Sequence, residues 1–115
     1  MAVDWAQQAA ANDAYRRVVL TTPYAQVSLM CIDDLVPQER HAYATQIITV
    51  ASGRARVYLD DARLVVRAGE TVVIPPGASH TVVRRGDAPL RLYSIYAPPL
   101  HARDAYAETR ADDTE

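Results

Sequence analysis

The sequence is poor in cysteine, in glycine and in long apolar runs. Among its 115 residues there are one cysteine, four glycines and neither lysine nor phenylalanine. The lone thiol, Cys31, excludes an internal disulfide and a cysteine-rich zinc site. Apolar runs span only a few residues, whereas a helix needs roughly 20 to cross a bilayer, so we expect no membrane segment. The first residues lack the basic start and apolar stretch of a signal peptide, which predicts a cytoplasmic protein.

Charge of neither sign is concentrated along the chain. Twelve arginines and fourteen acidic residues give a net charge of −2. The arginines are scattered, with adjacent pairs only at Arg16-Arg17 and Arg84-Arg85. Because a phosphate backbone is held by a continuous basic stripe, we expect no nucleic-acid partner. The length and the 50% hydrophobic content fit one globular domain with its own core.

From residue 15 onward, short β-branched runs alternate with turn residues every eight to twelve positions, which is typical of an antiparallel sandwich or barrel. Asp4 is placed to cap a short helix over 5–11, within an N-terminal segment (1–14) that is helical or irregular. A polar tail over 102–115 lacks the strand pattern, and we expect its last five residues to be disordered. We therefore predict an all-β domain over 15–101, with strands at 15–21, 24–32, 45–51, 55–59, 63–67, 71–74, 81–84 and 90–96.

Two of the three histidines stand in patterns that suit metal binding. His41 follows Glu39 by two residues, so the two side chains share a face of an extended segment. Gln46 shares that face only if a bulge or loop intervenes, and His80 follows a Pro-Pro-Gly turn. If these segments face each other inside a barrel, the four side chains converge. Two imidazoles and one carboxylate suit iron(II), manganese, nickel or zinc, with the amide oxygen of Gln46 as a weak fourth ligand.

The second of these segments carries a specific motif. Its spacing is Gly, five residues, Pro, one residue, Gly, two residues, His, and it resembles the second motif of the cupin superfamily of small β-barrels. The matching residues are Gly69, Pro75, Gly77 and His80, with Arg84 where the family motif has Asn.

The first segment resembles the other cupin motif, His-x-His, three or four residues, Glu, six residues, Gly. The matching residues are Glu39, His41, Gln46 and Gly53. Glu39 stands in place of the first His, and Gln46 in place of the acid. The resemblance implies a cupin-type jelly-roll β-barrel around one divalent metal ion held by Glu39, His41, Gln46 and His80. It also implies a homodimer, in which some relatives exchange an N-terminal strand, here residues 15–21.

Several site residues have two interpretations. Glu39 is either a ligand or a solvated loop acid, and Gln46 is either a ligand or a hydrogen-bond donor that orients substrate. His101, outside both motifs, is expected at the surface. Ser94 and Tyr96 share one face of their strand. Tyr96 is thus either a catalytic proton donor or a buried residue that fills the barrel.

Two further residues are candidates for substrate binding, together with Ser94. Tyr43 lies between His41 and Gln46, near the expected mouth of the cavity. Arg84 either holds a carboxylate or phosphate of the substrate or points outward into solvent.

Two functions follow from the resemblance. The first is a metal-dependent enzyme acting on a small polar metabolite, by isomerase, oxygenase or lyase chemistry, with the metal as Lewis acid or activator. The second is a non-catalytic cupin that binds a small molecule or has a structural role. The fold hosts many chemistries and does not choose between them.

Overall fold

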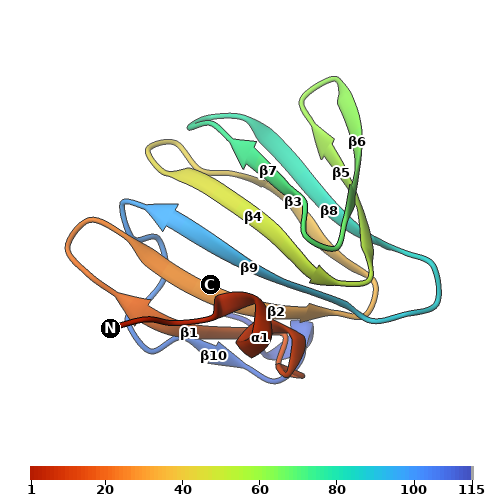
Figure 1. Cartoon of the computed structure of the whole chain (residues 1–115). Helices are drawn as coiled ribbons and strands as arrows, with labels where there is room; N and C mark the ends of the chain where they lie inside the picture. The colour runs from red at the N-terminus through yellow and green to blue at the C-terminus, as the bar shows by residue number, and fades with distance from the viewer. Residues whose placement is uncertain (115) are drawn as a thin grey trace.

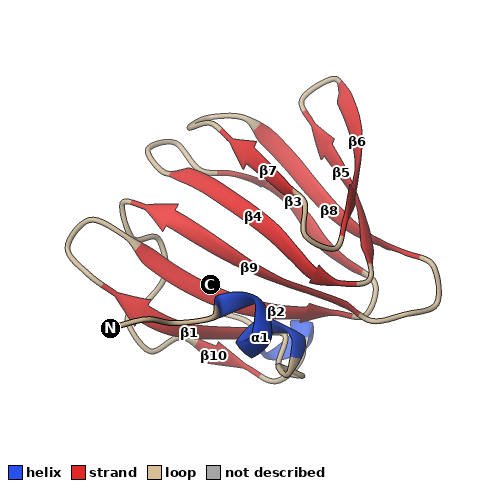
Figure 2. Cartoon of the chain, in the orientation of Figure 1, coloured by secondary structure: helices blue, strands red, loops and turns tan. Residues whose placement is uncertain are grey.

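The computed structural model describes residues 1–114 as two antiparallel sheets packed face to face (Figures 1 and 2). The larger sheet has the strand order β10-β1-β2-β9-β4-β7, and the smaller has the order β3-β8-β5-β6. The strands are β1 (Arg16–Thr21), β2 (Gln26–Ile32), β3 (Leu35–Arg40), β4 (Thr45–Ser52), β5 (Arg54–Leu59), β6 (Ala62–Arg67), β7 (Thr71–Ile74), β8 (Ser79–Arg85), β9 (Leu90–Ala97) and β10 (Tyr106–Ala107). The predicted all-β class is confirmed.

All eight predicted strands are present, with ends that differ by no more than two residues. β3 and β10 were not predicted. β3 contains Pro37, which has no N–H to donate to a ladder, but it lies at the edge of its sheet, where proline is tolerated. β10 has only two residues, too few for an alternation to be read.

The helix α1 (Trp5–Ala10) also confirms the prediction, ending one residue earlier than expected. Asp4 caps it, because its Oδ1 accepts a hydrogen bond from the Gln7 N–H at 3.0 Å. α1 packs against β9, β4 and β2 on the outer face of the larger sheet, where Ala9 is fully buried. Within the described residues, no helix is long and apolar enough to cross a membrane.

The space between the sheets is divided into an apolar part and a polar part. Alternate residues of β4, β8 and β9 point inward, as expected for half-buried strands. Along β9, Leu90 and Leu92 belong to the apolar core, whereas Ser94 and Tyr96 continue the same face into a polar region. A cluster of buried polar side chains therefore lies at one end of the sandwich.

The polar tail over 102–115 is mostly exposed, as expected, but part of it forms regular structure. β10 pairs with β1, and a short 3-10 helix, η1 (Arg110–Asp112), follows. The side chain of Asp113 forms an ion pair with buried Arg16, with 2.9 Å between Oδ1 and Nε. Glu115 lies outside the described residues. The expected disorder therefore fails over residues 111–113, because Asp113 is held by the charge of Arg16 on a distant strand.

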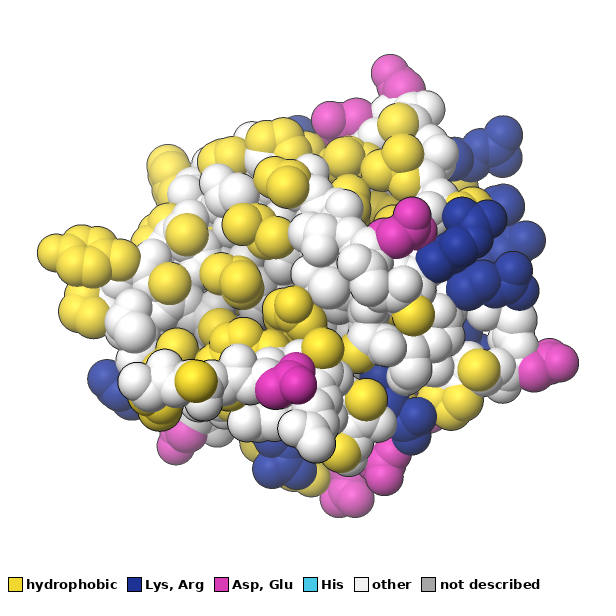
Figure 3. Space-filling model, viewed as in Figure 1, with side chains coloured by type: hydrophobic (Ala, Val, Ile, Leu, Met, Phe, Trp, Pro, Cys, Tyr) yellow, Lys and Arg dark blue, Asp and Glu magenta, His cyan; other side chains and the backbone are white. Residues whose placement is uncertain are grey.

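Strand pairing also brings together arginines that the sequence separates. Arg54 on β5 lies directly opposite Arg67 on β6 and Arg85 on β8. The space-filling view shows basic side chains gathered at one side of the molecule (Figure 3). Like charges directly opposite each other destabilise a sheet, so we expect this row to lower the stability of the smaller sheet.

Candidate metal site

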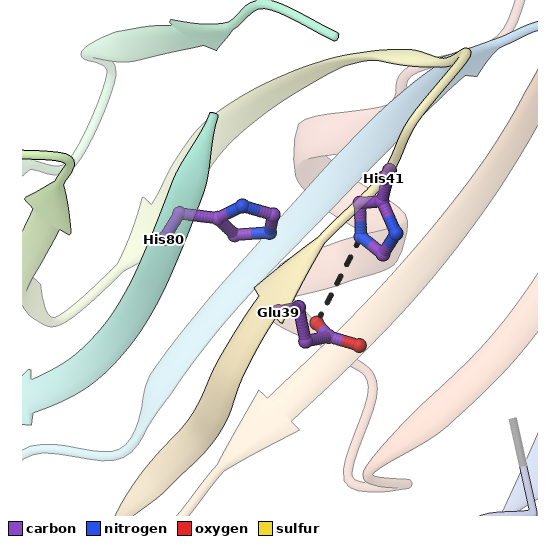
Figure 4. A group of neighbouring side chains, drawn as sticks. All are labelled: Glu39, His41 and His80. Carbon is purple, nitrogen blue, oxygen red and sulfur yellow. Dashed lines mark ion pairs between the residues drawn. The ribbon is translucent and has the colours of Figure 1, made fainter. Parts of the chain in front are cut away.

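Glu39, His41 and His80 come together at the polar end of the sandwich, each offering one ligand atom, and these atoms lie within 4.8 Å of one another. Glu39 on β3 lies opposite His80 on β8, and His41 follows the end of β3. The ring centroids of the two histidines are 5.1 Å apart. Figure 4 shows the two rings and the carboxylate turned toward one another.

A bulge in β3 turns Glu39 inward. Val36 pairs with Val82, but the register then slips by one residue, so that Glu39 pairs with His80. Without this slip, strict alternation from inward-facing Val36 would direct Glu39 to the outer face. The bulge falls at Pro37. It accounts for the proline within this strand and for the inward direction of the Glu39 carboxylate.

The turn before β8 is tied to the strand end that carries His41. The Gly77 N–H donates to the His41 carbonyl at 2.8 Å, and the Arg40 guanidinium donates to the Gly77 carbonyl at 2.7 Å. Gly77 has a φ of +83°, a conformation that favours glycine. These two hydrogen bonds, one from the backbone and one from a side chain, thus join the two motifs of the sequence.

His80 is the most constrained of the three. Its side chain is 2% exposed, and its Nδ1 lies 3.2 Å from the carbonyl oxygen of Ala78. That oxygen can only accept, so in the neutral ring the proton sits on Nδ1 and Nε2 offers its lone pair. Nε2 is buried and has no hydrogen-bond partner among the described residues. A buried acceptor without a partner is costly, and a bound cation removes that cost.

Gln46 adds a second unpartnered acceptor. Residues 41–44 form an irregular turn, so Gln46 enters β4 facing inward, between Tyr96 on β9 and Ile74 on β7. Its Nε2 donates to Ser94 Oγ at 3.3 Å and to the Tyr96 hydroxyl at 3.4 Å. Its Oε1 is buried and, within residues 1–114, has no partner.

These acceptors line a small enclosed cavity of about 10 Å³. A space of this size holds about one water molecule or a metal ion. The polar lining residues are Glu39, Gln46, His80, Ser94 and Tyr96, and the remainder of the lining is apolar. A metabolite does not fit inside, so a ligand of that size must approach from the side of His41 and Glu39, whose side chains are 13% and 27% exposed.

Burial sets the charge state of the group in the absence of metal. Desolvation raises the pKa of Glu39, partly offset by the charges of Arg16 and His80. Desolvation lowers the pKa of His41, and the charges of His80 and Arg16 lower it further. The contact between His41 Nε2 and Glu39 Oε1, marked in Figure 4, is 4.0 Å long, too long to reverse these shifts. The histidine therefore keeps the neutral form that a metal requires.

Of the four other predicted site residues, two line the cavity and two do not. Ser94 and Tyr96 line the cavity. Tyr43 follows His41 but is 88% exposed and lies outside the lining. Arg84 lies on the same face of β8 as His80, four residues further along the strand, a distance of about 13 Å. Arg84 does not line the cavity either.

Two residues near the site were not anticipated. His101, expected at the surface, is half-buried, with its ring 4.9 Å from that of Tyr96. Its Nε2 lies 2.8 Å from Nη1 of Arg16, whose side chain is 2% exposed. The surface prediction for His101 was wrong because the segment after β9 folds back over β1 and β2. The burial of Arg16 could not be predicted from its neighbours in the sequence. Strand alternation shows which side chains face inward, but not which inward charge meets a counterion.

Comparison with known proteins agrees with this geometry. The family described as Cupin domain matches residues 30–96, which include Glu39, His41, Gln46 and His80. The chain belongs to the cupin family. The sandwich is accordingly a jelly-roll, and the predicted resemblance to the cupin family is confirmed.

Individual relatives support the assignment. The crystal structure of BH2720 from Bacillus halodurans is 33% identical, with a TM-score of 0.93, over 96% of this cupin and 90% of that chain. The Bacillus subtilis protein YrkC is 33% identical over 88% of this cupin. A Klebsiella pneumoniae protein with a double-stranded beta-helix domain is 26% identical, with a TM-score of 0.69, over 82% of this cupin and 79% of that chain. The cupin spans 59% of the length of YrkC.

Proposed function

We propose that this cupin binds one divalent metal ion through Glu39, His41 and His80, with Gln46 as a fourth ligand. The observation that carries the proposal is the buried Nε2 of His80, which has no partner within residues 1–114 and lies beside the other two ligands. Two nitrogens and one or two oxygens suit iron(II), manganese, nickel or zinc. Oε1 of Gln46 supports the fourth position in the same way.

We further propose that the cupin is an enzyme acting on a small polar metabolite, of isomerase, oxygenase or lyase type. A bound metal supplies Lewis acidity or activates the bound molecule. Tyr96 is the candidate catalytic residue, because its hydroxyl lies 3.4 Å from Gln46 Nε2, beside the proposed ligands, and a tyrosine hydroxyl can donate a proton. Ser94 supports it from the same strand face. Tyr43 and Arg84 lie outside the cavity and are weaker candidates for substrate binding.

The size of the cavity favours a second candidate, a non-catalytic cupin with an occupied metal site. A cavity of about 10 Å³ leaves no interior room for a metabolite.

A homodimer and a cytoplasmic location remain predictions. Sedimentation analysis tests the first, and cell fractionation tests the second.

Elemental analysis of protein purified without added metal tests the metal site. We expect about one metal ion per chain in the wild-type protein and its loss in His80→Ala. His101→Ala is the matched control, since it removes an imidazole outside the donor set, and it should keep the metal. Substoichiometric metal that is unchanged in His80→Ala would overturn the proposal.

A second measurement separates the enzyme from the binding protein. Oxygen uptake by the iron-loaded protein, with a panel of small polar metabolites, separates an oxygenase from non-redox chemistry. Turnover that is lost in both His80→Ala and Tyr96→Phe supports the enzyme. Tight retention of one ligand without turnover of any metabolite supports the binding protein.

A further inference from the structure

Arg16, the first residue of β1, is a buried cation with an unusual counterion. A buried guanidinium stays charged and needs a partner of opposite charge. Its Nε donates to Asp113 Oδ1 at 2.9 Å, and its Nη2 donates to Asp113 Oδ2 at 3.3 Å. This two-pronged contact is the geometry by which arginine binds a free carboxylate.

Two aromatic rings in series, those of His101 and Tyr96, connect Arg16 to the candidate metal site. Its Nη1 lies 2.8 Å from His101 Nε2, and the His101 ring stacks edge-on against Tyr96 at 4.9 Å. On its other side, Tyr96 meets the ring of His41 at 6.3 Å. The charge of Asp113 also raises the pKa of Glu39, so the carboxylate on Arg16 is near enough to interact with the ligand group.

His101, the neighbour of Arg16 in this contact, is firmly held. Gln26 is fully buried, and its Oε1 accepts hydrogen bonds from the backbone N–H groups of Leu100 and His101. Its Nε2 donates to the His101 carbonyl and to Thr21 Oγ1. His101, which contacts Arg16, is therefore fixed by a completely satisfied buried amide.

Asp113, which supplies the carboxylate, is held much less firmly. Residues 108–112 are all exposed, and Asp113 follows the three-residue helix η1. An ion pair between Arg110 and Asp34 also tethers this segment, but those side chains are 46% and 57% exposed, so the pair contributes little. A segment with few buried contacts opens at a small free-energy cost.

We propose that Arg16 is the carboxylate-binding group of the ligand site and that Asp113 occupies its place until a ligand arrives. The ligand class is a small carboxylic acid, whose carboxylate replaces that of Asp113 on the guanidinium. Its remaining polar groups then face His41 and Glu39. The assignment rests on the proposed metal site for this second contact, while the exchange at Arg16 requires no metal.

Because Asp113 belongs to the same chain as Arg16, a test of carboxylate binding must first remove the Asp113 carboxylate. An attached carboxylate competes at an effective concentration in the millimolar range or above, so a simple monocarboxylate does not displace it from the wild-type protein. Asp113→Ala removes the competitor and leaves Arg16 buried without its counterion. Added acetate should then bind Arg16 and restore stability, because a ligand that binds only the folded state raises the melting temperature.

The experiment measures melting temperatures of metal-free protein by circular dichroism, with sodium acetate, sodium chloride at equal ionic strength, or neutral acetamide. For Asp113→Ala we expect a melting temperature well below wild type and a rise of about 4 °C in acetate beyond that in chloride. Acetamide should give no such rise. Asp112→Ala is the matched control, because it removes an exposed neighbouring acid, and it should behave as wild type.

The double variant Arg16→Met/Asp113→Ala decides the assignment and should lose the acetate effect. An equal acetate effect in the double variant, or none in Asp113→Ala, overturns the proposal. If Asp113→Ala does not fold, Asp113→Asn, which keeps the side-chain shape, replaces it in the same comparison. Because the protein is metal-free, failure of the metal site leaves this result unchanged, and failure of acetate binding leaves the metal site standing.

Discussion

Glu39 and His80 lie directly opposite each other on β3 and β8, although 41 positions separate them in the chain. Opposite residues of an antiparallel pair have Cβ atoms about 5 Å apart, so the register alone brings a carboxylate to an imidazole. The bulge at Pro37 is what places Glu39, and not its neighbour Gln38, on the inner face. Gln38 is exposed, and its side chain instead donates to Ser79.

Exchanging these two neighbours, as Gln38→Glu/Glu39→Gln, tests the role of the register. The composition and net charge stay the same, but the carboxylate moves to the outer face. We expect metal affinity to fall at least about 10-fold, measured by titration of metal-free protein. The single variant Gln38→Glu is the control and should keep wild-type affinity, whereas equal affinity in the double variant contradicts the ligand role of Glu39.

Glu39→Gln should also stabilise the metal-free protein. A half-buried carboxylate loses hydration that a neutral amide does not need, and the raised pKa of Glu39 reflects this cost of burial. We expect the free energy of unfolding, from urea denaturation in the absence of metal, to rise by about 1 kcal/mol. With saturating metal the order should reverse, because metal bound to the folded state stabilises the wild type more. A loss of stability without metal would show that the carboxylate has a structural role.

The dependence of stability on pH should carry a contribution from His101. Burial, and then the charge of Arg16, lower its pKa to about 4. Between that value and the ordinary pKa near 6.5, the unfolded chain binds a proton that the folded protein refuses. Stability is therefore fully present above about pH 6.5 and declines as the pH falls toward 4. Because the ring is partly exposed, we expect a decline of about 1–2 kcal/mol rather than the full value.

His101→Asn isolates that contribution. Urea denaturation of both proteins from about pH 7 to about pH 5 should show the wild-type advantage shrinking as the pH falls. The difference between the two proteins removes the contribution of carboxylates common to both. An advantage that stays constant with pH would mean that the ring keeps its ordinary pKa.

The sequence was informative where structure depends on neighbours in the chain. Alternating β-branched residues locate eight strands, and the turn at Gly77 places His80 because only two residues lie between them. It was silent where a residue depends on a distant partner. The counterion of Arg16 lies 97 residues away, and nothing local to Asp113 distinguishes it from its acidic neighbours. The bulge in β3 was missed for a similar reason, because its register is set by pairing with β8.

Gly53 should be far less tolerant of substitution than Gly69, although both have positive φ. A Cβ at Gly53 would lie 2.5 Å from the backbone oxygen of Pro89, whereas at Gly69 nothing lies within 4 Å. Gly69→Ala therefore adds only backbone strain, about 1 kcal/mol. Gly53→Ala adds a clash with backbone, and we expect a loss of about 3 kcal/mol or more in urea denaturation. Equal losses in the two variants would mean that the loop before β9 moves aside freely.

The arginine row on the smaller sheet should respond to salt. Arg54 lies between Arg67 and Arg85, and within residues 1–114 none of the three forms an ion pair with a carboxylate. Replacing the central charge, as Arg54→Thr, should raise the free energy of unfolding by about 0.5–1 kcal/mol at low ionic strength, because two like-charge pairs disappear and threonine suits a strand.

This gain should shrink as salt is added, because the charges are exposed and the screening length falls to about 3 Å at 1 M. Arg63→Thr is the matched control, since Arg63 lies on β6 opposite Tyr58 and faces no like charge directly. It shares the change in strand propensity but should show little dependence on salt. If both variants gain equally at every salt concentration, propensity explains the effect and the repulsion across the sheet is negligible. If Arg54→Thr is destabilising even at low salt, the position of the Arg54 guanidinium beside Gly86 stabilises the protein by more than the repulsion costs.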